Sequence, residues 1–93
     1  MDCDAKLIDY RKKVLLRAIG KVVKTKRLEL KKGINKFSFE YDIGNGLLSR
    51  LEKGNTDTQI TTRWKLANAF NIKFSDLVVE IENELPENFN FYE

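Results

Sequence analysis

The chain has 93 residues, 42% of them hydrophobic and 33% charged, with a formal net charge of +3, which is typical of one globular domain and too apolar for a disordered chain. It contains one cysteine and no histidine, which excludes an internal disulfide, a Cys/His zinc site and histidine-dependent nucleophilic catalysis. No apolar run approaches the roughly 20 residues that cross a bilayer, and no secretory signal opens the chain, so we expect a cytoplasmic protein. From the missing residue types we also expect that the protein is not an enzyme and holds no metal or cofactor.

The first expected element is a long helix over residues 6–32. Its apolar residues recur at spacings of three and four, and lysines and arginines fill the other faces. Gly20 lies inside this helix and marks either a break or a close packing contact. Gly33 is expected to end the helix, because glycine readily adopts the left-handed conformation of a helix C-terminus.

Two short helices are expected next, joined by a tight turn. Apolar residues over residues 34–41 form one stripe on two helical turns. Asp42 can adopt the left-handed conformation that closes this helix. The following helix covers residues 45–53 and stops at Gly54.

Two further helices and a tail complete the chain. Helical spacing of apolar residues resumes over residues 60–70, with Asn71 as the cap, and again over residues 74–82. The tail then combines Pro86 with aromatic residues, acids and asparagines. Because no strand signal is convincing, the sequence predicts an all-α domain of about five helices.

Charge is distributed unevenly along the chain. Residues 1–36 carry 12 Lys/Arg against 4 Asp/Glu, residues 37–79 carry 5 of each, and residues 80–93 carry 5 Glu and no basic residue. A basic N-terminal half beside an acidic tail favours a polyanionic partner for the basic half. A solvated basic helix surface is the alternative, and charge alone leaves both open.

Two short helices joined by a turn of three or four residues are the outline of a helix-turn-helix. The second helix can enter a major groove if one side is anchored by apolar residues and the other exposes small or polar ones. Leu48 and Leu51 are expected to face inward, and Arg50 on the other side can donate two hydrogen bonds to a guanine. The candidate base-reading residues on that side are Asn45, Gly46, Ser49 and Arg50. A generic amphipathic helix with a solvated face is the alternative.

Three separate stretches resemble the phage-repressor/Cro-like (XRE-type) helix-turn-helix family. Residues 48–54, Leu-Ser-Arg-Leu-Glu-Lys-Gly, resemble the family's Ile-Ser-Arg-Ile-Glu-Arg-Gly, and residues 37–38, Phe-Ser, take the place of its Leu-Ala pair. Residues 66–77 are similar to its closing Leu-Ala-x-Ala-Leu-Gly-Val-x-x-x-x-Leu, and Arg27 stands where the family commonly has an arginine. The resemblance spans residues 16–79.

The resemblance implies a compact five-helix lambda-repressor-like domain over residues 1–79, with a core at 16–79, a helical extension at 1–15, and a tail at 80–93 for packing or dimerisation. It implies a sequence-specific double-stranded DNA-binding transcriptional regulator, a repressor or autoregulator. Arg27 and Glu52 occupy positions where the family often has an ion pair between the first and third helices. Phosphate contacts would fall to amides at helix starts and to Asn35, Lys36, Lys53, Thr56, Thr58 and Arg63.

Several positions depart from the family pattern. Ile34 replaces a glutamine that often contacts a phosphate, and Asp42 replaces the usual turn glycine. Gly44 stands where Ser or Thr normally caps the recognition helix, and Gly46 has no side chain at a usual base-reading position. The loop over residues 55–58 has no basic residue. These departures predict modest affinity with few direct base contacts.

The acidic, aromatic tail leaves two structural possibilities and a second function open. It can pack on the first helix, where its glutamates would meet lysines, or form the homodimer that we favour by analogy with the family. The alternative function is a protein-binding module, such as the antitoxin of a toxin–antitoxin pair, whose tail binds a protein partner. An enzymatic role for Glu40, Asp42 and Lys53 rests only on their proximity in sequence.

Overall fold

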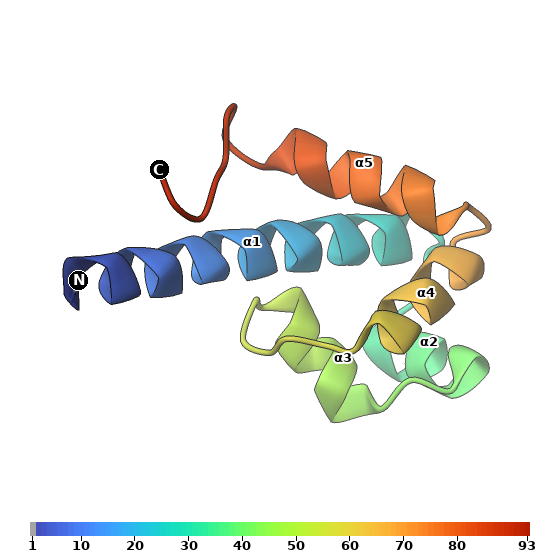
Figure 1. Cartoon of the computed structure of the whole chain (residues 1–93). Coiled ribbons are helices and arrows are strands. Elements are labelled where there is room, and N and C mark those ends of the chain that lie inside the picture. Colours follow the sequence, from blue (N-terminus) through green and yellow to red (C-terminus); the bar gives the residue numbers. More distant parts are fainter. Residues whose placement is uncertain (1) are drawn as a thin grey trace.

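The structure is a computed structural model that describes residues 2–93, and residue 1, where the expected domain begins, lies outside them. The five helices are α1 (Asp2–Glu29), α2 (Ile34–Tyr41), α3 (Asn45–Glu52), α4 (Ile60–Ala69) and α5 (Phe74–Glu84). The helix α1 runs through the length of the molecule, with α5 along one side of it and α2, α3 and α4 on the other (Figure 1). Residues 2–93 contain no strand, so the prediction of an all-α fold of about five helices is confirmed.

The C-terminal end of α1 differs from the prediction. The helix ends at Glu29, and Lys31, with φ 59°, adopts the left-handed conformation that was expected of Gly33. Gly33 is extended, with φ −73° and ψ 170°, and precedes α2. The turn is closed by the Lys31 N–H group, which donates a hydrogen bond of 2.9 Å to the Leu28 carbonyl, and Arg27 Nη1 donates one of 2.7 Å to the Lys32 carbonyl. The prediction that Gly33 ends the helix was wrong.

All five helices contribute to one hydrophobic core. The largest fully buried side chains come from every helix, and they are Val23, Phe37, Leu48, Leu51, Leu66 and Leu77. The ring of Phe37 lies 4.8 Å from that of Tyr41 and 5.6 Å from that of Phe70, measured between centroids. Burial of these apolar side chains holds short helices such as α2 and α3 in place, because eight-residue helices are unstable alone.

Gly20 marks a close packing contact and no break, since α1 is continuous through it. A Cβ atom at this position would lie 2.5 Å from the Leu51 carbonyl oxygen and 2.6 Å from that of Glu52. The backbone of α1 therefore touches the C-terminal turn of α3 directly, and no side chain fits between them.

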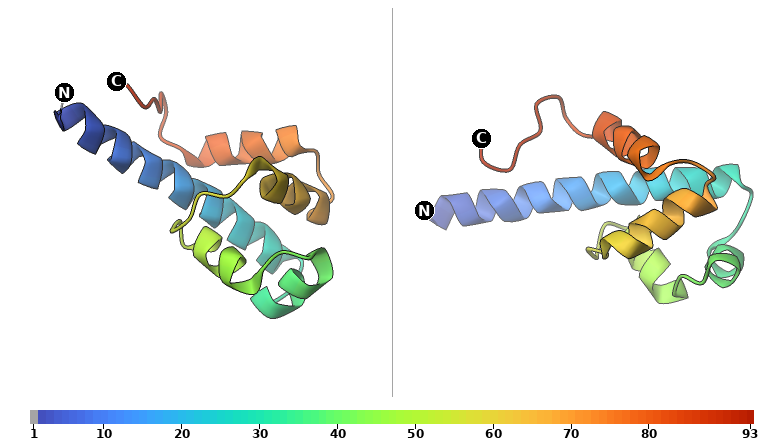
Figure 2. Two further views of the ribbon diagram at one scale, coloured as in Figure 1. Left: turned by 60° about the horizontal axis from the view of Figure 1, so that its bottom comes forward. Right: turned by 45° about the vertical axis from the view of Figure 1, so that its right-hand side comes forward.

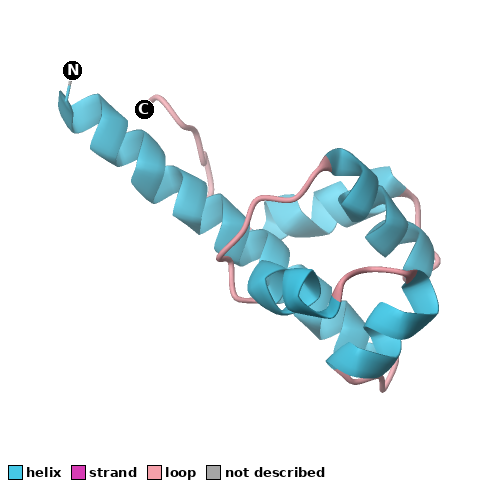
Figure 3. Ribbon diagram, turned by 90° about the horizontal axis from the view of Figure 1, so that it is seen from below, coloured by secondary structure: helices cyan, strands magenta, loops and turns pink. Residues whose placement is uncertain are grey.

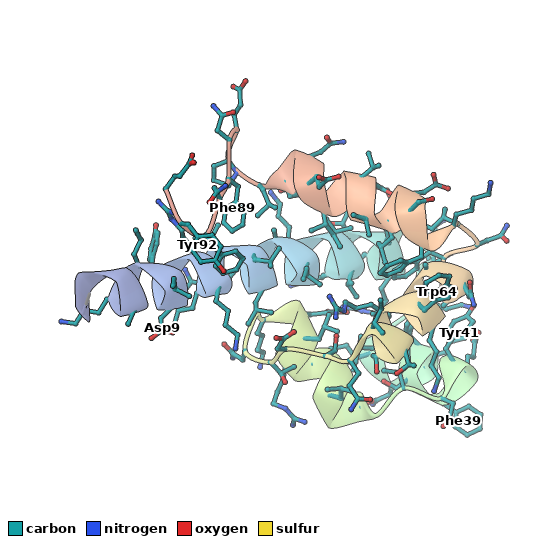
Figure 4. The ribbon with its side chains drawn as sticks, in the orientation of Figure 1. Asp9, Phe39, Tyr41, Trp64, Phe89 and Tyr92 are labelled. Atoms are coloured by element: carbon teal, nitrogen blue, oxygen red, sulfur yellow. The ribbon has the colours of Figure 1, made fainter. Side chains whose placement is uncertain are left out.

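The C-terminal part of the chain packs on the side of α1 away from α3. Ion pairs join Lys26 to Glu80 at 2.6 Å and Lys21 to Glu84 at 3.0 Å. Beyond α5 the tail continues toward the N-terminal half of α1, and Phe89 lies beside that helix (Figures 1 and 4). Within this single chain the glutamates therefore meet the lysines of α1, as in the packing alternative. None of the helices in the described part is both long and apolar enough to span a membrane.

We expect Ser38→Ala to raise the free energy of unfolding by about 1 kcal/mol. The Ser38 side chain is buried in α2, and its hydroxyl has no hydrogen-bond partner among residues 2–93. Removing an unsatisfied buried hydroxyl and introducing the best helix former both favour the folded state. Urea unfolding followed by circular dichroism measures the change, with Ser75→Ala on an exposed part of α5 as the control. A loss of stability would mean that the Ser38 hydroxyl has a partner in solution.

Candidate nucleic-acid interface

The turn between α2 and α3 is fixed by its own backbone. Asp42 has φ 54° and ψ 50°, the left-handed conformation expected from the sequence. The N–H groups of Asp42 and Ile43 both donate to the Ser38 carbonyl, and the Ile43 side chain is buried. Lys65 of α4 donates a hydrogen bond of 3.3 Å to the Asp42 carbonyl. Figure 3 shows the result from below, with α2 and α3 joined at an angle by a short loop.

One side of α3 is buried and the other is open. Leu48 and Leu51 are 0% and 2% exposed. On the opposite side Asn45, Gly46 and Arg50 are exposed, and Ser49 is half-buried. The four candidate base-reading residues thus lie on one helix, turned away from the apolar anchor.

The starts of α2 and α3 are joined by a hydrogen bond between two exposed side chains. The Asn45 amide nitrogen donates to the Asn35 side-chain oxygen. Asn35 thereby occupies one amide hydrogen of Asn45, whose carbonyl oxygen and second amide hydrogen remain available. The sequence placed these residues in different roles, base reading for Asn45 and phosphate contact for Asn35, and did not reveal that they touch.

Gly46 makes room for Arg50. A Cβ atom at position 46 would lie 3.1 Å from Arg50 Nη1, so the guanidinium lies across the bare backbone of the first turn of α3. The sequence analysis gave Gly46 as a candidate base-reading position without a side chain and did not connect it with Arg50. The spacing of four residues was the available signal, since residues i and i+4 are neighbours on a helix surface.

Arg27 and Glu52 form the ion pair that the family resemblance implied. Arg27 Nε donates to Glu52 Oε2 at 2.6 Å, Nη2 donates to Oε1 at 2.8 Å, and the two side chains are 6% and 4% exposed. These hydrogen bonds raise the pKa of the Arg27 guanidinium, and the charge of Glu52 adds to this, while burial acts in the opposite direction. The two-pronged geometry fixes the end of α3 against the end of α1.

The candidate phosphate contacts are not equally accessible. Asn35, Lys36 and Lys53 are exposed, while Thr56 is half-buried. Arg63 is partly buried, and its Nε atom has no hydrogen-bond partner in the described part of the chain. Thr58, two residues before α4, is only 9% exposed. The expected phosphate contact by its side chain is therefore corrected: Thr58 does not belong to the open surface, because the loop turns it toward the interior.

Glu40, near the C-terminal end of α2, is paired with a lysine of the preceding loop. Glu40 accepts a hydrogen bond of 2.6 Å from Lys32 Nζ, which also lies 3.1 Å from the Tyr41 hydroxyl. These hydrogen bonds, with that to Glu40 foremost, raise the pKa of the Lys32 ammonium. No group of three Asp, Glu, Cys or His side chains in the described residues is placed to hold a metal ion.

Comparison of the chain with protein-family models, with curated proteins and with solved structures found no match. The likeness to the phage-repressor/Cro-like family rests on the residues quoted from the sequence, and the function that it implies is a proposal.

Proposed function

We propose that the protein binds double-stranded DNA sequence-specifically, with α3 in the major groove, and regulates transcription from that site. The observation that carries this proposal is the two-sided character of α3. Leu48 and Leu51 anchor one side, and Asn45 and Arg50 are exposed on the other. A helix with its side chains is 10–12 Å wide, about the width of the major groove of B-DNA.

Arg50 is the central base-reading residue of this proposal. Its guanidinium can donate to O6 and N7 of a guanine at once, which is the commonest specific contact in the major groove. Because Gly46 has no side chain, the backbone of the first turn can approach the bases closely while Arg50 extends along it. Asn45, held by Asn35, would present its remaining amide hydrogen and its oxygen to an adenine edge.

Phosphate contacts would come from the starts of α2 and α3. Neither Gly33 nor Gly44, the residues before these helices, caps the helix with a side chain. The first N–H groups of both helices therefore remain available as donors, and Lys36 adds an exposed positive charge beside them. These contacts fix the orientation of the protein and carry no sequence information.

We further propose that the protein acts as a homodimer that occupies two half-sites about one DNA turn apart, as a repressor. Light scattering on a sizing column tests the stoichiometry, with and without a duplex selected from a random pool for binding to the protein. One protomer bound per duplex, with no second half-site in the selected sequence, would refute the dimer. The alternative function is a protein-binding module that uses the tail, where Phe89 and Phe91 are partly buried and pack edge to face at 5.5 Å while Tyr92 is 83% exposed.

The direct test is selection of duplexes from a random pool at physiological salt. We expect one short motif to be enriched, and its affinity to fall steeply as salt rises, as in any complex anchored on phosphates. A pool that returns without an enriched motif would refute sequence-specific binding.

We predict that Arg50→Ala weakens binding to the selected duplex by about 1–3 kcal/mol and relaxes the preference at one base pair. The reason is the loss of two hydrogen bonds to one guanine, while the anchored side of α3 is untouched. Fluorescence anisotropy titrations against the selected duplex and its single-base variants measure both effects. Lys73→Ala, an exposed substitution before α5, is the matched control. Unchanged affinity and preference after Arg50→Ala would remove this residue from the interface.

A further inference from the structure

A groove of about 460 Å³ lies between the N-terminal half of α1 and the loop that follows α3. Its lining combines basic side chains of α1 with the backbone of a glycine in the loop and includes Asp9, Lys12, Lys13, Arg17, Gly54 and Asn55. All of these residues except Gly54 are exposed. The N-terminal half of α1 extends beyond the body of the molecule on this side (Figure 2). The groove is therefore open to a long ligand that passes along the helix.

Positive charge is concentrated on the groove side of α1. On the opposite side, Glu80 and Glu84 of α5 neutralise Lys26 and Lys21. Figure 4 shows Phe89 and Tyr92 of the tail on that side of α1 and Asp9 on the other. Within the described residues, no ion pair involves Lys12 or Lys13. The acidic C-terminal part thus neutralises positive charge on one side of α1, and the groove side stays basic.

The groove begins where the proposed recognition helix ends. Gly54, the second residue after α3, has φ 74°, and a Cβ atom there would lie 2.8 Å from Arg17 Cγ. From Gly20, where α1 touches α3, the helix continues for eight residues to Lys12, which is about 12 Å at 1.5 Å per residue. That distance corresponds to roughly four base pairs of B-DNA. A duplex that crosses α3 and runs along α1 would reach the groove within its next half turn.

We propose that the groove side of α1, through Lys12 and Lys13, binds the phosphates of the duplex that flanks the site read by α3. The inference rests on the proposed DNA-binding function and assigns it a second contact area outside the helix-turn-helix. Charge complementarity and continuity with the end of α3 identify the occupant as the sugar–phosphate backbone of the same duplex. Asp9, inside the groove, opposes this binding and limits its strength.

The test compares the wild-type chain, Lys12→Gln/Lys13→Gln, Asp9→Asn and the control Lys31→Gln/Lys73→Gln. Each is titrated with the selected duplex between 50 and 300 mM salt. Because each phosphate contact contributes a slope of about −0.9 to log K against log salt, we expect the slope of Lys12→Gln/Lys13→Gln to be shallower by about 2. Its affinity should fall about tenfold at 0.1 M salt with the base preference unchanged, while Asp9→Asn binds about threefold tighter. The control, which removes the same charge elsewhere, should bind within twofold of wild type.

A second measurement uses duplexes with the flanks shortened to the motif itself. Wild type should lose affinity on the short duplex, and Lys12→Gln/Lys13→Gln should not, because its flank contact is already missing. Equal salt slopes for wild type and this variant would overturn the proposal and leave the groove to another ligand, such as an acidic protein segment. Wild-type protein that binds no duplex would overturn the DNA-binding function itself, so the two failures are distinct. Circular dichroism spectra that match wild type show that the substituted α1 stays helical.

Discussion

Glu52→Leu is expected to lower the free energy of unfolding by about 3 kcal/mol and the midpoint of thermal unfolding by roughly 15 °C. The substitution removes both carboxylate oxygens that accept hydrogen bonds from Arg27, whose side chain is only 6% exposed. The guanidinium would then keep a single hydrogen bond, to the Lys32 carbonyl, in a place that water hardly reaches. A buried charge without its partner costs far more than the pair contributes, because the desolvation penalty is no longer offset. Urea unfolding followed by circular dichroism measures the loss.

The matched variants separate the cost of a lone charge from the value of the pair. Arg27→Met should be destabilising to a similar degree, because it strands the Glu52 carboxylate. The double substitution Arg27→Met/Glu52→Leu should recover to within about 1 kcal/mol of wild type, since apolar side chains of similar size can replace a buried ion pair. A double variant as unstable as the two single losses added together would show that the residues do not act as a pair. If the folded double variant also loses base preference, the pair serves to orient α3 more than to stabilise it.

The short helices were predictable because local chemistry determines their ends. Asp42 closes α2 in the left-handed conformation that its short polar side chain tolerates, and Gly54, with φ 74°, follows α3. The end of α1 was not predictable in the same way. Lys31 takes the left-handed position although Gly33 is available, because Arg27 holds the Lys32 carbonyl. A contact made by the Arg27 side chain, five residues before Lys32, outweighed the local preference of glycine.

The same distinction separates the residues of the candidate site that could be predicted from the sequence from those that could not. Helical periodicity alone assigns Leu48 to the inside of α3 and Arg50 to the outside, and the structure places them so. Thr58 lies in a loop without periodicity, so its burial could not be inferred from neighbouring residues. The groove beside Lys12 was equally hidden, because it depends on where the loop after α3 runs relative to a helix more than forty residues earlier. Periodicity specifies the faces of an element, and the path of a loop is specified by packing.

Gly20→Ala is expected to lower the free energy of unfolding by about 2 kcal/mol, although alanine favours an isolated helix by roughly 1 kcal/mol over glycine. The added Cβ atom would lie 2.5 Å from the Leu51 carbonyl oxygen and 2.8 Å from the Glu52 carbonyl carbon. Both are backbone atoms of α3, so no side-chain rotation relieves the overlap and the two helices must move apart. Any such shift also lengthens the hydrogen bonds between Glu52 and Arg27, which lie at the same contact.

The comparison with Gly33→Ala makes this prediction specific to the contact. A Cβ atom at Gly33 meets nothing within 4 Å, and its φ of −73° suits any residue, so this substitution should change stability by less than about 0.5 kcal/mol. Urea unfolding of the two variants side by side measures the difference. If Gly20→Ala were as stable as Gly33→Ala, α1 and α3 would not touch through their backbones in solution. Because α3 rests on α1 at this glycine, the added methyl group should displace α3 as a whole. We therefore also expect the folded Gly20→Ala protein to bind the selected duplex more weakly than wild type, although the substitution removes no residue that contacts a base.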